Sequence, residues 1–400
     1  MEKMKILQVS NRVPWPLNEG GNIGIYNYTK AYCELGYDVT LYCLDGQKHN
    51  TPIKEATSEL SKYASLYIHP IDTDINLDDA IKHLIRNKSY NVSRFYNATF
   101  ESELIKLLSN ESFDVVQLEG TFVGPYIASI RKVFKGLLSL RMHNVEFEIW
   151  QRLAQNEKNP LKKLYLKILA RQLEKYESKI IRQVDTIVPV TDQDLYKFRK
   201  LFAEGVYKSI PAGINLNTWK FSPSKSTNRW YHIGSMEWHA NAEAVDWYMK
   251  EIHPLIIKNN ANYTLNLAGK GIDANLFRSM PQVTVTENVE NAYDFVNSND
   301  VCIVPLKSGS GIRLKILEAM AAGKLVISTT IGAQGIDYID GKHLLIANTP
   351  SEFLSVFIEI NNHQIDFQAI IKNARILIEE NYATKALVKK QSMFYQGLLK

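Results

Sequence analysis

Short apolar runs rich in β-branched residues alternate with longer segments of helical pattern along the whole chain. Several runs, such as residues 5–10 (KILQVS) and 137–141 (LLSLR), are apolar nearly from end to end. This is typical of strands in a parallel sheet, because helices cover both faces of such a sheet. Helical segments between consecutive strands also indicate parallel pairing through right-handed crossovers. The alternation therefore predicts an α/β protein with two doubly wound, Rossmann-like parallel sheets.

The expected strands divide into two series. They are residues 5–10, 38–43, 65–69, 114–118, 137–141 and 186–190 in the first half, and 229–234, 263–269, 283–286, 300–305, 325–329 and 343–347 in the second.

A chain of 400 residues is too long for one ordinary hydrophobic core and suits two domains of about 200 residues each. We expect an N-terminal domain over residues 1–210 and a C-terminal domain over 229–382. Gly, Pro, Ser and Asn cluster at 211–228, which predicts the linker. Open parallel sheets bind ligands at the carboxyl ends of their strands, so two facing sheets would place a ligand in a cleft between the domains.

Composition excludes several classes of protein. The net charge of +5, from 47 Lys and Arg against 42 Asp and Glu, is too small and too dispersed to indicate nucleic-acid binding. Cys33, Cys43 and Cys302 form no CxxC or zinc-binding pattern, which favours reduced thiols in a cytoplasmic protein. The N-terminal apolar run is too short for a signal peptide, and no uncharged stretch reaches the roughly 18 residues of a membrane span.

Residues 308–324, SGSGIRLKILEAMAAGK, predict a helix with an unusual start. Arg313 and Lys315 fall in the expected first turn, where the helix dipole disfavours each cation by roughly 0.3–1 kcal/mol. A phosphate or diphosphate at this end would reverse the penalty, because it attracts the cations and the free backbone N–H groups together. Glu318 on the same helix would then accept hydrogen bonds from a ribose. The alternative is a solvated basic face with a surface glutamate.

Glycine and histidine follow three other expected strands. Gly20 and Gly21 precede a helix, where paired glycines either let the backbone approach a ligand or simply form a flexible loop and a turn. In AGKGID (268–273), Gly269 and Gly271 suit either ligand approach or a simple tight turn. His143 follows the strand at 137–141, as a residue facing a ligand or as an ordinary loop residue. The chain has no GxxxxGK[ST] motif and no complete GxGxxG after the first strand, which argues against a P-loop NTPase and a dinucleotide-dependent dehydrogenase.

Several of these segments together resemble the GT-B glycosyltransferases, specifically retaining family four. The most specific is LKSGSGIRLKILEAMAAGKLVISTTIGAQGI (306–336), which is similar to the family's donor-nucleotide motif. The glycine pair after the first strand, HNVE (143–146), PAGIN (211–215) and IGSMEWHANAEAV (233–245) also resemble the family. The resemblance covers nearly the whole chain. It implies the GT-B fold and a final helix, 383–400, that returns to the N-terminal domain.

The resemblance also implies roles for individual residues. The donor-binding residues would be Gly20, Gly21, Gly234, Ser235, Gly269, Lys270, Val289, Gly309, Ser310, Gly311, Ile312 and Glu318, with Glu318 on the ribose and the backbone near Val289 on the base. His143 would lie near the reacting sugar, and Arg313 and Lys315 would serve catalysis.

The sequence departs from the family pattern at two places. Ser310 occupies the position, eight residues before Glu318, where the family has another glutamate. The segment after the first strand of the second domain, SMEWHAN, lacks the Arg and Lys that many members carry there. The basic charge would then come from Arg313 and Lys315, helped by Lys270.

The function that the resemblance implies is transfer of a sugar, with retention of configuration, from a nucleotide sugar to a glycan or lipid-linked acceptor in cell-surface polysaccharide biosynthesis. We expect no cofactor and no metal, since the chain has no DxD motif suited to a metal-bound diphosphate. Two alternatives stay open. One is a non-hydrolysing sugar-nucleotide epimerase that uses Glu119 and Glu146, and the other is a noncatalytic nucleotide-sugar-binding module, which Ser310 would suit.

The segment 152–182 is strongly basic, with nine Lys and Arg against three Glu. It predicts either peripheral contact with the inner face of a membrane or the solvated face of a surface helix.

Overall fold

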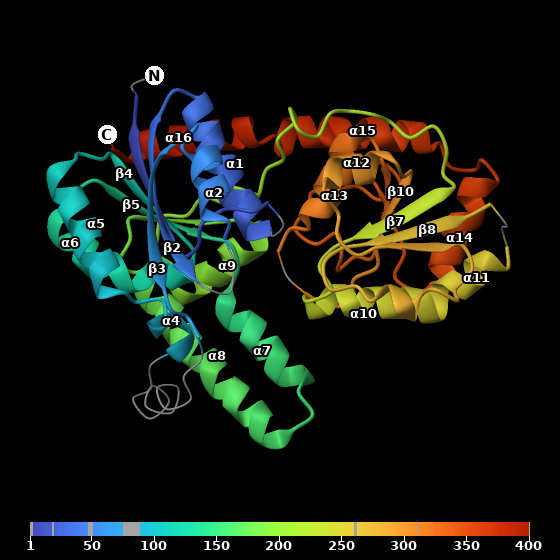
Figure 1. Ribbon diagram of the computed structural model, residues 1–400, viewed down its shortest axis with the longest axis horizontal. Coiled ribbons are helices and arrows are strands. Elements are labelled where there is room, and N and C mark those ends of the chain that lie inside the picture. The colour runs from blue at the N-terminus through green and yellow to red at the C-terminus, as the bar shows by residue number, and fades with distance from the viewer. Residues whose placement is uncertain are drawn as a thin grey trace. The chain divides into compact units, whose positions relative to one another are not determined.

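The computed structural model describes residues 3–17, 20–46, 51–74, 89–259, 262–309 and 311–399. The chain forms two compact units (Figure 1). The first unit comprises Met1–Gly213 together with Thr384–Lys400, and the second comprises Ile214–Ala383. Residues 214–228, most of the expected linker, thus belong to the second unit.

The first unit contains a six-stranded parallel sheet in the order β3-β2-β1-β4-β5-β6. Its strands are β1 (Lys5–Ser10), β2 (Asp38–Gly46), β3 (Ser65–Ile71), β4 (Val115–Glu119), β5 (Leu137–Met142) and β6 (Thr186–Pro189). Its helices are α1 (Gly20–Glu34), α2 (Ile53–Leu60), α4 (Tyr90–Ser93), α5 (Ala98–Asn110), α6 (Ile127–Val133), α7 (Glu146–Asn156), α8 (Pro160–Ile180), α9 (Asp192–Leu201) and α16 (Thr384–Leu399).

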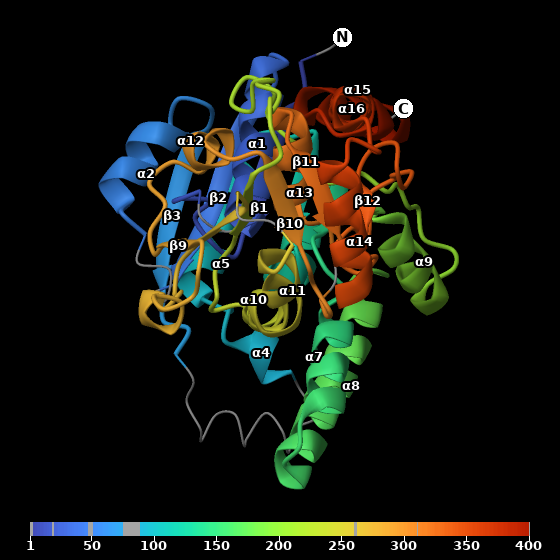
Figure 2. The ribbon, with the colours of Figure 1, turned by 90° about the vertical axis from the view of Figure 1, so that its right-hand side faces the viewer.

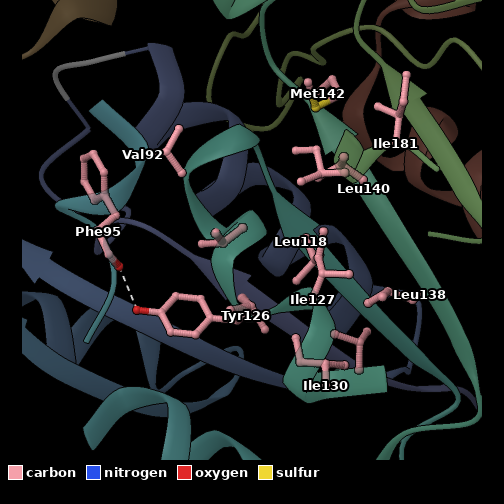
Figure 3. Close-up of a cluster of buried hydrophobic side chains, with 14 of the residues drawn as sticks. Val92, Phe95, Leu118, Tyr126, Ile127, Ile130, Leu138, Leu140, Met142 and Ile181 are labelled. Atoms are coloured by element: carbon pink, nitrogen blue, oxygen red, sulfur yellow. Dashed lines mark hydrogen bonds between the residues drawn. The ribbon is translucent and has the colours of Figure 1, made fainter. Parts of the chain in front are cut away.

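Hydrophobic side chains pack on both faces of this sheet, because successive residues of a strand point to opposite sides. Leu7 and Val9 of β1 join a cluster with α5, α6 and α8, whereas Ile6 joins a cluster with α1, α2 and α16. Figure 3 shows part of the first cluster, where the buried Tyr126 also donates a hydrogen bond of 2.7 Å to the Phe95 carbonyl. The long apolar runs of the sequence are therefore strands covered on both sides.

The second unit repeats the same topology, with the sheet order β12-β11-β10-β7-β8-β9. Its strands are β7 (Arg229–Ile233), β8 (Thr264–Ala268), β9 (Val283–Thr286), β10 (Val301–Val304), β11 (Leu325–Ser328) and β12 (Leu345–Ile346). Its helices are α10 (His239–Trp247), α11 (His253–Ile257), α12 (Ala292–Asn297), α13 (Leu314–Ala322), α14 (Pro350–Asn361) and α15 (Phe367–Asn381). Tyr231 and Trp230 on β7 enter different apolar clusters, so this sheet too is covered on both faces.

All twelve expected strands are present within one to three residues of their expected ends, and both sheets are parallel and doubly wound. The fold class predicted from the sequence is therefore confirmed. The final helix, α16, packs against α1 within the first unit.

Helix starts in both units carry the side-chain caps that local sequence favours. Asn97, Thr191 and Thr349 accept hydrogen bonds from backbone N–H groups in the first turns of α5, α9 and α14. Helix α13 differs, because Arg313 stands at its N-cap and its side chain makes no cap hydrogen bond. Its other end is conventional, since Gly323 closes it in the left-handed conformation (φ 79°).

Among the described residues, no helix has the length and apolar content needed to cross a membrane.

Candidate active site

Each sheet has a switch point, where consecutive connections leave in opposite directions. In the first unit it lies between β1 and β4, and in the second between β7 and β10. Ligands of doubly wound sheets bind at this point, outside the carboxyl ends of the strands. The loops after β7 and β10 contain six of the predicted site residues that the structure describes, namely Gly234, Ser235, Gly309, Gly311, Ile312 and Arg313.

Lys315 reaches from α13 to the loop after β7. Its Nζ donates a 2.9 Å hydrogen bond to Asn241 Oδ1, and Asn241 Nδ2 donates to the Ser235 carbonyl at 2.8 Å. A Cβ atom at Gly234 would lie 2.5 Å from Lys315 Nζ and 2.7 Å from Asn241 Nδ2. The loop therefore needs glycine at 234 for the ammonium group to come this close.

His232 completes the surroundings of this ammonium group. Its Nδ1 donates to the Ile303 carbonyl at 2.9 Å, which leaves Nε2 as an acceptor 3.4 Å from Lys315 Nζ. Burial lowers the pKa of His232 well below its usual value, and the nearby Lys315 lowers it further, so the ring is neutral. Burial also lowers the pKa of Lys315 to about 8. The site thus holds a poorly solvated cation, the kind of group that gains from an anionic ligand.

Arg313 lies in the loop after β10 rather than in the first helical turn, where we had expected it. Its guanidinium stacks on the Trp238 ring at 5.1 Å, and Nη1 donates to the Gly311 carbonyl at 2.7 Å. Gly309 and Gly311 have φ of 114° and 81°, which L side chains rarely adopt. A Cβ at Gly309 would also lie 2.6 Å from Arg313 Nη2. The two glycines therefore let the loop fold closely around a buried guanidinium.

Glu318 lies one turn along α13 from Lys315 and is half-buried. Burial raises the pKa of its carboxyl to about 7, although Lys315 opposes this shift. A carboxylate with so little solvation gains from hydrogen-bond donors such as sugar hydroxyls.

Gly269 holds the loops after β7 and β8 together. Its φ is 137°, and a Cβ there would lie 2.0 Å from the Gly234 carbonyl oxygen. The side chain of the adjacent Lys270 is exposed and pairs with Glu237 at 3.0 Å. An exposed ion pair of this kind is weak, so the expected role of Lys270 beside a diphosphate stays a prediction.

The remaining predicted residues of this unit are less informative. Val289 is half-buried in the loop after β9, and Ile312 packs its side chain against the apolar cluster under α13. Ser310 lies outside the described residues.

His143 follows β5 in the first unit, and its Nε2 lies 2.8 Å from Glu119 Oε2. Burial by itself raises the pKa of Glu119, but Arg141 at 3.3 Å and His143 outweigh it and hold that pKa at about 2. Burial lowers the pKa of His143, although its hydrogen bond to Glu119 opposes the shift. An ionised Glu119 accepts the Nε2 proton of neutral His143, so Nδ1 is the ring nitrogen left to meet a ligand.

Glu119 also joins a polar network inside the sheet. Gln8 Nε2 and Gln117 Nε2 donate to its Oε1 at 3.0 and 2.5 Å. Gln117 Oε1 in turn accepts from Tyr32 at 2.8 Å and from Gln391 of α16 at 2.8 Å. Sequence reasoning missed this network, although polar residues in otherwise apolar strands are its signal.

This geometry bears on the epimerase alternative. Glu119 is completely buried, ionised and bonded to four side chains, which does not suit a carboxyl that must exchange protons with a substrate. Glu146 is half-buried at the start of α7, and its pKa is raised mainly by desolvation. Glu119 therefore does not offer the proton-exchanging carboxyl that the epimerase alternative requires of it.

At the start of α1, Gly20 is exposed, and a Cβ at Gly21 would lie 3.3 Å from the Arg12 guanidinium. The described residues contain no group of three His, Cys, Asp or Glu side chains placed to hold a metal ion.

The matching family model covers part of the second unit. Residues 227–362 match the family described as glycosyl transferases group 1. An uncharacterized 44.6 kDa protein in the cps region of Klebsiella pneumoniae is 26% identical over 95% of this chain and 97% of its own length.

Two solved structures are similar over the full length. Sucrose-phosphate synthase from Thermosynechococcus elongatus has a TM-score of 0.68 at 15% identity, with 99% of both chains covered. The pneumococcal O-GlcNAc transferase GtfA, solved with UDP and GlcNAc, has a TM-score of 0.66 at 12% identity, with 100% of both chains covered. These likenesses, together with the two sheets, confirm the GT-B fold.

Proposed function

We propose that this protein is a glycosyltransferase that moves a sugar from a nucleotide sugar to a glycan or lipid-linked acceptor. Its GT-B fold and the match of residues 227–362 to glycosyl transferases group 1 support the proposal. The observation that carries the proposal is the pair of poorly solvated cations, Arg313 and Lys315, beside the glycine loops at the switch point of the second unit. Such a site suits a diphosphate.

The donor nucleotide is bound by its diphosphate and its ribose. Lys315 and the backbone of Gly309 and Gly311 meet the diphosphate, and Glu318 accepts hydrogen bonds from the ribose hydroxyls. As the bond between the sugar and the diphosphate breaks, negative charge grows on the leaving nucleotide. Arg313 and Lys315 stabilise that charge without a bound metal, as preorganised cations in a poorly solvated site.

His143 acts on the sugar. Glu119 holds its ring through Nε2, so Nδ1 accepts a hydrogen bond from a sugar hydroxyl in a fixed direction. Glu119 is a positioning residue here, and Arg141 keeps it ionised. We propose that the transfer retains the configuration at the anomeric carbon.

The acceptor belongs to cell-surface polysaccharide biosynthesis. The relative in the cps region of Klebsiella pneumoniae supports this role, and the UDP and GlcNAc bound by GtfA make UDP-sugars the first donors to test. We place the activity in the cytoplasm, at the inner face of the membrane that presents a lipid-linked acceptor.

Incubation with a panel of nucleotide sugars, read by mass spectrometry, tests the proposal. We expect transfer to an added glycan precursor, or slow release of free sugar and nucleoside diphosphate when no acceptor is present. An isomerised donor would favour the epimerase, and tight binding with no turnover would favour the binding module. We expect turnover to survive EDTA, and a complete loss that Mn²⁺ or Mg²⁺ restores would contradict the assignment of Arg313 and Lys315.

A further inference from the structure

Helices α7 and α8 form a hairpin that extends beyond the sheet of the first unit, as both views show (Figure 1 and Figure 2). Its base is held by Glu177, whose carboxyl oxygens accept hydrogen bonds from Thr121 Oγ1 at 2.6 Å and from the Phe147 backbone N–H at 3.2 Å. Its tip is ordered by Asn159, which caps α8 by accepting from the backbone N–H groups of Leu161 and Lys162 at 3.0 and 3.1 Å. The hairpin is therefore a well-formed projection.

The tip exposes large apolar side chains. Leu161 is 79% exposed, Leu164 58% and Leu153 47%. Leu166, Leu169 and Leu173 on the other side of α8 are buried and complete the packing of the hairpin. Leu161 and Leu164 are therefore mostly exposed, and a cluster of apolar residues at the end of a projection indicates contact with another apolar phase.

Behind the tip, α8 carries a stripe of cations, which we call the basic stripe. Lys167, Arg171, Lys175 and Lys179 follow one another at intervals of four residues, which places them on one side of the helix over about 18 Å. All four are exposed. Within the described part of the chain no carboxylate forms an ion pair with any of them, whereas Lys162 near the tip pairs with Glu157 at 2.7 Å.

The exposed leucines and the basic stripe share one face. At about 100° per residue, Leu161 and Leu164 fall within about 60° of the middle of the stripe. This face is therefore apolar in its first turns and cationic along the rest. Such an order matches a bilayer surface, where apolar side chains enter the interface and lysines meet anionic headgroups.

We propose that the α7–α8 hairpin docks this protein on a bilayer rich in anionic lipid. Leu153, Leu161 and Leu164 enter the interface, and the basic stripe lies along the headgroups. An acidic polysaccharide would satisfy the stripe but would leave the leucines in water, so the combined face favours the membrane. The inference deepens the proposed function, on which it rests for its purpose, because it names the surface that brings the enzyme to a lipid-linked acceptor.

Cosedimentation of the full chain with vesicles tests the docking. We expect binding to phosphatidylcholine vesicles that contain phosphatidylglycerol and little binding to phosphatidylcholine alone. Arg171→Gln with Lys175→Gln should lower the partition coefficient about tenfold or more and weaken its salt dependence. Leu161→Ser with Leu164→Ser should lower it about tenfold at every salt concentration. Lys389→Gln with Lys390→Gln on α16 removes the same charge from another exposed site and should change little.

Three results would overturn the proposal. The first is failure of the protein to bind anionic vesicles. The second is vesicle binding that neither the Arg171/Lys175 nor the Leu161/Leu164 double variant changes. The third is equally strong binding to soluble dextran sulfate that the Leu161/Leu164 double variant does not alter. Thermal melting of each variant identifies any loss of folding. Vesicle binding needs neither donor nor acceptor, and release of sugar from the donor needs no vesicles. Vesicle binding without sugar release would therefore support the docking and contradict the proposed function. Sugar release without vesicle binding would support the proposed function and contradict the docking.

Discussion

Replacing Lys315 by methionine separates two effects of its charge, the loss of folding stability and the gain in ligand affinity. Methionine keeps most of the length of the side chain and removes the ammonium. Burial lowers the pKa of Lys315 from 10.5 to about 8. At about 1.4 kcal/mol per pH unit, this corresponds to about 3 kcal/mol of cost for the charged form in the folded protein. Since the side chain keeps some contact with water, we expect about 1–3 kcal/mol.

The cost depends on pH in a direction that can be worked out. Below pH 8 the folded and the unfolded chain both carry the charge, and the full cost applies. Between about 8 and 10.5 the folded chain has lost the proton while the unfolded chain keeps it, so stability rises with pH. Urea unfolding at pH 7 and pH 10 should therefore show wild type gaining about 1–3 kcal/mol relative to Lys315→Met. Lost hydrogen bonds to Asn241 and His232 affect both pH values and cancel in this difference.

The same poorly solvated charge should strengthen the binding of a nucleotide diphosphate. Calorimetric titration of Lys315→Met with uridine, UMP and UDP should show about a 10- to 100-fold loss for UDP, in the range for hydrogen bonds to charged groups, and little loss for uridine. High salt should reduce the loss. Lys372→Met, at an exposed position of α15, is the matched control and should leave all three affinities unchanged. Equal losses for the three ligands, or a stability difference that is the same at pH 7 and 10, would refute the reasoning.

Four further predictions concern other residues of the two units. In calorimetric titration, Glu318→Gln should weaken the binding of UDP by about 1–3 kcal/mol and the binding of a 2′,3′-dideoxy analogue much less. Equal losses for the two ligands would mean that Glu318 does not bind the ribose. The depressed pKa of Glu119 stabilises the folded protein above pH 4.5, and this stability is lost as the pH falls toward 2. Glu119→Gln should therefore lower the free energy of unfolding by about 3 kcal/mol at pH 7 and flatten its decrease at acid pH, as measured by urea unfolding. His143→Ala should lower kcat far more than donor affinity, and an unchanged kcat would make His143 a binding residue. A Cβ at Gly269 would meet the Gly234 carbonyl oxygen at φ 137°, so Gly269→Ala should destabilise the fold by about 3 kcal/mol in urea unfolding. A Cβ at Gly234 would meet the side chains of Lys315 and Asn241, so Gly234→Ala should lose UDP affinity with a smaller loss of stability.

Much of the fold was predictable because the signal is local. A strand that is buried on both faces must be apolar along its length, and the intervening helical patterns leave parallel pairing as the simple solution. For Gly269 the sequence left ligand approach and a simple tight turn open, and for Gly309 the family resemblance implied a backbone that faces the ligand. Their role as contacts with a carbonyl and with a guanidinium was not predictable, because the partners are distant in sequence.

By itself, the sequence determined the twelve strands, the two parallel sheets and the segments that end at their carboxyl edges. Only the tertiary structure decided which polar groups meet there. Parallel register places Gln8 beside Gln117 and Glu119 beside Arg141, and this turns scattered polar residues into one network around His143. In the same way, Lys315 reaches the loop at Gly234 only because β7 and β10 are neighbours. Strand formation follows from local side-chain pattern, whereas the desolvation and pairing of a charge depend on neighbours that only the folded sheet supplies.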